Sequence, residues 1–512
     1  MRNSKLLILN TTVLTLSGFL MRTIAVSFNV YLTNRIGSAG IGLFQLIMSV
    51  YALAVTIASA GIRLGATRLV TESLCKKETS ADKVIKLCIK YSLFTGCAVA
   101  GIMFILSGFI SRKWIMDERA EYSLKILALS LPPVAVSAAL NGYFTARKTL
   151  VKYSIIQLIE QLCRIGATVF GLAVAAGNGL SALCGAIAAG STLSEVVSCV
   201  LSCTFYIIDK KEPNGIDKKG LLKRLMHISV PDAIGSGMRS ILLTVEHLLI
   251  PVGFRKSGQK TEEALSTYGT VHGMALPVIL YPAAVLTALS GLLVPELSGF
   301  LAMGQNEKIN RVSNECLKLT AMFAFGTGVF MFFFAEKTAL AVYGDTESAF
   351  YIKLLSVLLP VMYLDTVTDG LLKGLDQQLA SMRYNIIDSG LCVVLVYFLL
   401  PQFAVKGYIF ILFLSEIINF AFSFNRLTKT AEIKINLISD LGKPLLAATG
   451  SGSVLHIIMY FYFTDISSKP ALALLTVLFV CIYFPLLYIL GCIDKKDIRQ
   501  LKPIKNNKIT LD

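Results

Sequence analysis

Three ionisable residues share one face of an otherwise apolar stretch between Leu225 and Pro251. Asp232, Arg239 and Glu246 follow one another at intervals of seven residues, so on a helix they form a single stripe. The stretch is long enough to cross a bilayer, at about 1.5 Å per residue against roughly 30 Å of hydrocarbon. A charge at the bilayer centre costs about 2.5–3.5 kcal/mol even on the lenient insertion scale, so a lipid-facing stripe is implausible. The stripe either forms structural ion pairs or lines a cavity for polar cargo, and we favour the cavity.

A related pattern occurs near the start of the chain. The sequence SGFLMR, which ends at Arg22, resembles GSGMR, which ends at Arg239, and Asn29 follows Arg22 at the spacing at which Glu246 follows Arg239. This indicates a weak internal repeat. A guanidinium stays protonated and offers a bidentate fork that suits phosphate. Two arginines across a central cleft would favour an anionic head group such as a diphosphate, whereas an exporter of cationic drugs would be expected to present acids.

Other acids interrupt apolar segments and are candidates for ion coupling. Asp365 and Asp369 precede Lys373 at four-residue steps, and Glu195 stands alone on another segment. Each of these acids is either a protonated, hydrogen-bonded core residue or a site that binds a coupling Na⁺ or H⁺.

The remaining charges within apolar segments have a simpler interpretation. Glu160 and Arg164 are four residues apart, which predicts a salt bridge on one helix face. Asp388 and Glu416 are single acids on two further segments, and each is, like Glu195, either a protonated, hydrogen-bonded core residue or a cation-coupling site.

The composition requires a membrane to surround these residues. Of 512 residues, 55% are apolar and only 16% are charged, which is typical of an integral membrane protein. Fourteen segments are predicted to span the bilayer, near Leu6–Leu32, Ile41–Ile62, Val84–Ile110, Leu124–Phe144, Tyr153–Ala176, Leu180–Ile208, Leu225–Val252, Thr270–Leu293, Leu317–Ala335, Ile352–Leu372, Tyr384–Leu400, Gly407–Phe424, Leu445–Phe463 and Leu472–Leu490. The first begins after Arg2 and Lys5 like a signal peptide, but it is too long, and an uncleaved span is the better prediction.

The predicted fold is all-α, with about fourteen transmembrane helices in two six-helix lobes plus two C-terminal helices. A polar linker after the sixth span divides the chain, and because six is even the lobes share one orientation, as in a parallel repeat. The predicted domains are residues 1–208 (first lobe), 209–224 (cytoplasmic linker), 225–430 (second lobe), 431–492 (the last two spans) and 493–512 (a cytoplasmic tail).

The net charge of +16 is explained by topology. If the N-terminus is cytoplasmic, lysine and arginine concentrate in the cytoplasmic loops, as the positive-inside rule requires. We therefore expect a multi-pass protein of a bacterial cytoplasmic membrane, in contact with membrane lipids, with both termini cytoplasmic and no nucleic-acid partner.

No catalytic or metal-binding arrangement is evident. The sequence contains no P-loop, HExxH, nucleophile elbow or glycine-rich dinucleotide turn. The eleven cysteines include no CxxC, and the four histidines are scattered, so neither a disulfide framework, a metal site nor a cofactor is expected. The predicted external loops near Arg255–Glu263 and Glu336–Phe350 are short. An enzyme is therefore disfavoured and a secondary transporter favoured.

The chain resembles a known family. It is similar to the polysaccharide-transport branch of the multidrug/oligosaccharidyl-lipid/polysaccharide (MOP) exporter superfamily, and within it to the lipid II flippases and their sporulation relatives. The resemblance extends over nearly the whole chain but consists of short motifs. These are Gly61-Ile62 with Thr67–Glu72, Arg239 with Leu249–Pro251, Tyr268–Pro277, and Leu293–Ser298.

The resemblance implies alternating-access flipping of an undecaprenyl-diphosphate-linked sugar precursor, for cell-wall, spore-cortex or polysaccharide synthesis. By position, Arg22 and Arg239 match arginines thought to bind the diphosphate, and Arg63 lies near a further cleft arginine of the family. The chain departs from the family pattern with Arg63 and Gly65 just after Gly61, and with Glu246-His247 where a single Asp or Asn is commoner. These departures leave the cargo and the coupling ion open.

Two alternatives remain. The first is a cation-coupled multidrug antiporter of the same superfamily, in which Asp365, Asp369 or Glu195 binds Na⁺ or H⁺. Twelve spans are usual there, so two extra spans argue against it. The second is a non-transporting scaffold of a cell-wall synthesis complex, which predicts that neutralising both cleft arginines leaves function intact. In the favoured hypothesis, Asn29, Asp232 and Glu246 complete the cleft.

Overall fold

The computed structural model describes residues 2–59, 61–76, 81–147, 149–209, 220–433, 436–462 and 468–493. Every regular element in these ranges is helical, which confirms the predicted all-α class. The helices are α1 (Arg2–Ser59), α2 (Ile62–Lys76), α3 (Ala81–Phe109), α4 (Ala120–Ala128), α5 (Leu131–Ala146), α6 (Leu150–Val174), α7 (Gly179–Asp209), α8 (Leu221–Lys256), α9 (Thr261–Gly269), α10 (Leu276–Leu280), α11 (Ala283–Ala302), α12 (Asn306–Phe333), α13 (Ala335–Tyr343), α14 (Ala349–Gly374), α15 (Gln378–Thr430), α16 (Lys443–Tyr462) and α17 (Lys469–Ile489), with π-helical turns η1 (Ile110–Ile115), η2 (Thr270–Ala275) and η3 (Leu437–Gly442).

The helices are long and apolar enough for a multi-span membrane protein. In the described part of the chain, 11 helices could each cross a bilayer, or up to 12 if the bent pair α4 and α5 is one span. Helices α1 and α15 have 58 and 53 residues, and each contains one residue with non-helical backbone, Gly37 or Ala404. At about 1.5 Å per residue each is long enough for two crossings. The exact count of fourteen spans stays a prediction.

The chain folds as two compact units. The first comprises Met1–Met274 and Asn385–Ser415, and the second comprises Ala275–Tyr384 and Glu416–Asp512. These units differ from the two six-helix lobes expected from the sequence, because α15 contributes to both. The lobe boundaries stay a prediction. Residues 210–219 of the predicted linker and 494–512 of the predicted tail lie outside the described residues.

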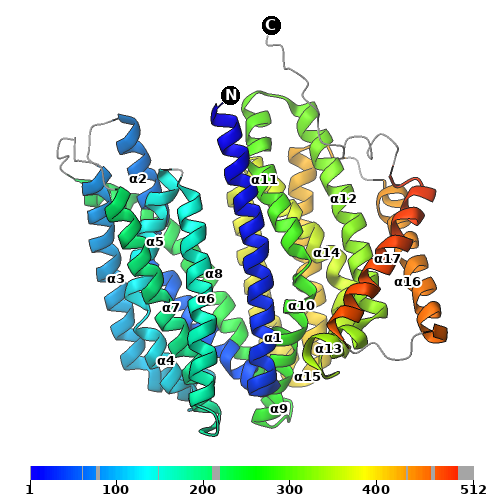
Figure 1. Cartoon of the computed structure of the whole chain (residues 1–512), viewed down its shortest axis with the longest axis horizontal. Helices are drawn as coiled ribbons and strands as arrows, with labels where there is room; N and C mark the ends of the chain where they lie inside the picture. Colours follow the sequence, from blue (N-terminus) through cyan, green and yellow to red (C-terminus); the bar gives the residue numbers. More distant parts are fainter. Residues whose placement is uncertain are drawn as a thin grey trace. The chain divides into compact units, whose positions relative to one another are not determined.

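In the first unit, α2, α3, α5, α6 and α7 run alongside one another (Figure 1). Close approach depends on small residues, as is usual between membrane helices. A Cβ added to Gly142 of α5 would lie 2.6 Å from the carbonyl oxygen of Arg63 in α2. The core between these helices contains Ile62, Val70, Ile85, Leu140 and Phe144, each at most 2% exposed.

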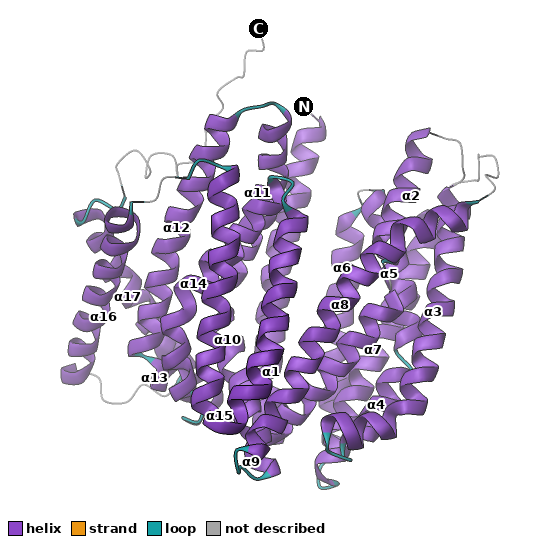
Figure 2. Ribbon diagram, turned by 180° about the vertical axis from the view of Figure 1, so that it is seen from behind, coloured by secondary structure: helices purple, strands orange, loops and turns teal. Residues whose placement is uncertain are grey.

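In the second unit, α12 packs between α14 and α16 (Figure 2). Buried tyrosines connect the helices through main-chain carbonyls: Tyr363 donates to the oxygen of Ile279 at 2.7 Å, and Tyr483 donates to that of Met322 at 2.8 Å. The side chain of Arg426, near the C-terminal end of α15, donates two hydrogen bonds to Gln377, at 2.6 and 2.9 Å. Gln377 directly precedes the first residue of α15. Helix ends and helix middles are thus each held by polar contacts.

Candidate functional site

The predicted stripe of charges lies on α8, a 36-residue helix with Pro231 and Pro251 inside it. Asp232 and Arg239 are exposed and Glu246 is half-buried. The guanidinium of Arg239 makes one long hydrogen bond, from Nη2 to Oδ1 of Asn385 at 3.5 Å. Within the described residues no carboxylate lies at salt-bridge distance from Arg239. This side chain is therefore available to an anion.

A further acid, Asp388 of α15, interacts with the middle of the stripe and with one of its ends. Its carboxylate interacts electrostatically with Arg239 and also with Glu246, which lies two helical turns further along α8. Ser415 donates a hydrogen bond of 2.6 Å to the Asp388 carboxylate. The sequence identified Asp388 only as an isolated acid. An acid three residues after Asn385 in an apolar segment was the available signal, but only the fold reveals its partners.

Next to Glu246, two histidines form a buried aromatic cluster. Tyr268 and His247 are hydrogen-bonded at 2.8 Å through Oη and Nδ1, and Tyr408 pairs with Nε2 of His272. The imidazole rings of His247 and His272 are 4.9 Å apart between centroids. The sequence described these histidines as scattered, which was wrong for this pair, because α8 and η2 bring them together. The described residues contain no group of three or more His, Cys, Asp or Glu side chains that could hold a metal ion.

Of the predicted cleft residues near the N-terminus, Asn29 has a defined partner. Its Nδ2 donates to the carbonyl oxygen of Gly273, in η2, at 2.6 Å. Arg22 is half-buried on the same helix, two turns earlier. Asn29 thus makes a helix–helix contact in addition to any role toward cargo.

Arg63 is exposed on α2. The glycines on either side of it, Gly61 and Gly65, explain a departure from the family pattern. Gly61 has a positive φ of +66°, and a Cβ there would lie 2.3 Å from the carbonyl oxygen of Ser229 in α8. A Cβ on Gly65 would lie 2.6 Å from the Ser229 hydroxyl. The glycines therefore allow α2 to contact α8.

The predicted salt bridge between Glu160 and Arg164 is confirmed, at 2.6 Å between Nη2 and Oε1. The same Nη2 lies 3.3 Å from Oε1 of Glu195, and Nε donates to Ser194 at 3.3 Å. Glu195 is the single acid within its apolar segment, as the sequence shows, but α6 and α7 pack side by side and bring Arg164 to it. One guanidinium here serves two carboxylates.

In the second unit, both predicted coupling acids accept hydrogen bonds. Asp369 accepts from Lys373 at 2.9 Å and from Ser381. Asp365 accepts from Asn419 at 3.1 Å. The four-residue spacing of Asp369 and Lys373 is consistent with their contact, whereas Ser381 and Asn419 come from α15 and had no signal in the sequence.

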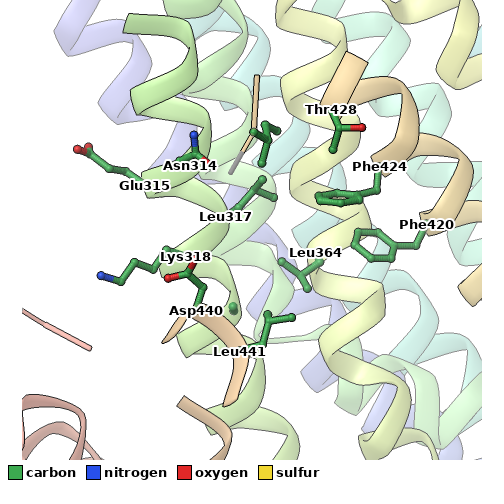
Figure 3. A pocket seen from close by; sticks show the side chains of 12 residues that line it. Asn314, Glu315, Leu317, Lys318, Leu364, Phe420, Phe424, Thr428, Asp440 and Leu441 are labelled. Carbon is green, nitrogen blue, oxygen red and sulfur yellow. The ribbon is translucent and has the colours of Figure 1, made fainter. Parts of the chain in front are cut away.

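The second unit also contains a cavity of about 550 Å³ that the sequence did not predict. Phe420, Phe424 and Leu364 line its apolar part, and Lys318 and Asp440 lie on its polar side (Figure 3). None of the predicted site residues lines it. The other lining residues are Asn314, Glu315, Leu317, Ala321, Thr428, Ile433 and Leu441.

Comparison with known families decides the class of the chain. Residues 7–294, more than half of the sequence, match the family described as polysaccharide biosynthesis protein. The chain belongs to this family. This confirms the resemblance predicted from the motifs.

Individual relatives are distant but extensive. Stage V sporulation protein B of Bacillus subtilis (strain 168) is 20% identical over 391 residues, which cover 74% of this chain and 75% of the relative. Lipid II flippase MurJ of the same organism is 22% identical over 171 residues, covering 32% and 31% of the two chains.

Solved structures share the fold. A structure of lipid II flippase MurJ in an inward closed conformation aligns with a TM-score of 0.71 at 13% identity, covering 93% of this chain and 97% of that one. An inward-facing multidrug resistance MATE family transporter of the MOP superfamily aligns with a TM-score of 0.65 at 14% identity, covering 83% and 100%. The fold is therefore the one these transporters share.

Proposed function

We propose that the protein is a secondary transporter that flips an undecaprenyl-diphosphate-linked sugar precursor, lipid II or a related lipid-linked oligosaccharide, across the bacterial cytoplasmic membrane by alternating access. Family membership and the relatives that include a lipid II flippase support this cargo class. The distribution of basic residues supports a topology with both termini in the cytoplasm.

The observation that carries the proposal is the state of Arg239. Arg164 and Arg239 both lie within long apolar helices of the first unit, and they differ sharply. Arg164 is held by two carboxylates, as a structural cation should be. Arg239 is exposed, makes one long hydrogen bond, to Asn385, and forms no salt bridge with the described carboxylates, although Asp388 interacts with it electrostatically. An exposed guanidinium inside a membrane-crossing helix requires a counter-charge, and a diphosphate matches its fork geometry.

In this proposal the other cleft residues have supporting roles. Arg22 binds the diphosphate together with Arg239, and Asp388 and Glu246 limit the net positive charge of the site. Asp232 and Asn29 are placed to contact sugar or neighbouring helices. Cation binding at Asp369 would compete with Lys373, and cation binding at Glu195 would compete with Arg164.

A multidrug antiporter is the second candidate, because the MATE alignment covers the whole of that transporter. The test compares two cargoes with one preparation. Purified protein in proteoliposomes is assayed for translocation of fluorescent lipid II and for efflux of a cationic dye. The proposal predicts lipid translocation without dye efflux. Dye efflux alone would favour the antiporter, and neither activity would favour the scaffold alternative.

A further inference from the structure

The cavity of about 550 Å³ lies wholly within the second unit, where the beginning of α12, the end of α15 and η3 come together. Its volume falls within the roughly 300–1,000 Å³ that is usual for small-molecule sites. In the predicted topology these segments share the cytoplasmic face: α12 enters the membrane there, α15 leaves it, and α16 enters it again directly after η3. The cavity is therefore expected at the depth of the cytoplasmic lipid head groups.

One wall of the cavity is aromatic. Phe420 and Phe424 are one helical turn apart on α15, and their ring centroids are separated by 5.4 Å. The rings face Leu317 of α12 and Leu364 of α14 across the hollow (Figure 3). None of these four side chains carries a hydrogen-bonding group. This wall therefore suits a hydrocarbon chain better than a polar solute.

The other side of the cavity carries charge. Lys318 is half-buried on α12, and Asp440 of η3, which packs against α12, lies near it (Figure 3). Lys443 follows Asp440 by three residues, and the thiol of Cys492 interacts electrostatically with all three charged groups. Among the described residues neither lysine forms a salt bridge. Two lysines and one aspartate leave one positive charge at this side of the cavity.

The acids around the cavity are held by contacts of their own. The side chain of Asn436 caps η3, and its main-chain N–H donates to the Asp440 carboxylate at 2.8 Å. An ionised carboxylate has about four acceptor positions, so Asp440 can accept further hydrogen bonds. Glu315 also lines the cavity, but it is paired with Arg311 at 2.8 Å. The positive charge of Lys318 is therefore not cancelled by Glu315.

We propose that this cavity binds a membrane phospholipid with one negative charge, from the cytoplasmic leaflet. The phosphodiester pairs with Lys318 and Lys443, and the beginning of an acyl chain packs on Phe420 and Phe424. Basic pockets between helices on the cytoplasmic side are recognition sites for anionic lipids. The hydroxyls of a glycerol head group donate to Asp440, whereas a phospholipid with an ammonium head group has no net charge to balance the lysines. Phosphatidylglycerol has both required features.

This lipid is distinct from the proposed cargo. Arg22 and Arg239, which are assigned to the diphosphate, belong to the first unit, and every residue that lines the cavity belongs to the second. The inference therefore stands whether or not the protein transports lipid II.

The test uses the single tryptophan of the chain. In a chain with Trp114→Phe and Phe424→Trp, the only indole lies in the aromatic wall. The protein is reconstituted in phosphatidylcholine bilayers that contain a fraction of phosphatidylglycerol or phosphatidylcholine brominated on the acyl chains, because bromine quenches indole fluorescence. We expect phosphatidylglycerol to bind about fivefold more strongly than phosphatidylcholine, as one uncompensated lysine implies. Lys318→Ala should abolish this preference.

The matched control is Lys308→Ala, which removes an exposed lysine of the same helix that lies over Phe300 and outside the cavity. It should keep the preference. Equal quenching by the two brominated lipids, or a preference that survives Lys318→Ala, would overturn the proposal. So would equally strong quenching by brominated phosphatidylethanolamine. Soluble glycerol phosphate should not relieve the quenching, and relief would replace the lipid site by a site for free phosphate.

A second measurement keeps the native aromatic wall. Phosphatidylglycerol added to the purified native chain in detergent should raise the thermal unfolding midpoint, and it should not do so for Lys318→Ala/Lys443→Ala. Equal shifts in both proteins, or no shift in either, would contradict the site. Neither measurement contains lipid II, so a failure here is distinguishable from a failure of the proposed transport function.

Discussion

Arg239 and Arg164 allow cargo binding to be separated from structural support. Both lie on membrane-crossing helices of the same unit, but Arg164 contacts carboxylates at 2.6 and 3.3 Å, whereas Arg239 makes a single contact, of 3.5 Å, to a neutral amide. Replacing Arg239 by alanine breaks no salt bridge among the described residues and removes only the electrostatic interaction with Asp388. We therefore expect Arg239→Ala to weaken cargo binding without lowering the stability of the fold.

The magnitude follows from the bond that would be lost. A hydrogen bond to a charged group contributes about 1.5–3 kcal/mol, and each 1.4 kcal/mol corresponds to roughly a factor of ten in affinity. Arg239→Ala should thus weaken cargo binding about 10- to 140-fold. Arg239→Lys keeps the charge but loses the bidentate fork, so its loss should be intermediate.

The assay measures lipid II translocation in proteoliposomes over a range of lipid II concentrations, beside the thermal unfolding midpoint of each variant. The reasoning predicts a large rise in the half-saturating concentration for Arg239→Ala, a smaller rise for Arg239→Lys, and midpoints within error of the parent. A half-saturating lipid II concentration for Arg239→Ala equal to that of the parent would refute the assignment of Arg239 to the cleft. A fall in the midpoint as large as that of Arg164→Ala would show that Arg239 is structural.

Further predictions concern stability and topology. Arg164→Ala should lower the unfolding free energy by about 2–4 kcal/mol, because it strands two carboxylates that are only partly exposed; adding Glu195→Gln should recover part of this, and no recovery would argue against a shared guanidinium. Gly253→Ala should lower the unfolding free energy by about 1–3 kcal/mol through overpacking, which a lower thermal unfolding midpoint would show. A midpoint equal to that of the parent would mean that the surrounding side chains make room for the added methyl group. Glu263→Cys should be labelled by impermeant maleimide in intact cells, but Glu307→Cys only after permeabilisation; the reverse would invert the topology.

Local pattern was sufficient for much of the fold. Long apolar segments predict membrane helices because the bilayer fixes their length and forbids unsatisfied backbone. Four-residue spacing likewise predicted the contact of Arg164 with Glu160, since both partners share one helix face. Contacts between distant segments had no such signal.

The long-range contacts are where sequence reasoning fell short. Glu195 looked unpaired, because nothing in the sequence of α7 indicates that α6 presents Arg164 to it. Asp388 looked isolated for the same reason, and its link to Arg239 depends on the packing of α15 against α8. The close approach of α1 to α9 was hidden as well, since a glycine such as Gly269 reveals such a contact only when the opposing backbone is known.

The most direct test of the account compares the parent protein with the Arg22→Ala/Arg239→Ala double variant in lipid II translocation, at equal protein density in the liposomes. Arg311→Ala, which removes an exposed arginine paired with Glu315 at 2.8 Å, is the matched control. The account predicts translocation by the parent and the control and none above background by the double variant. Equal rates in all three would contradict the claim that cleft arginines bind the diphosphate of the cargo.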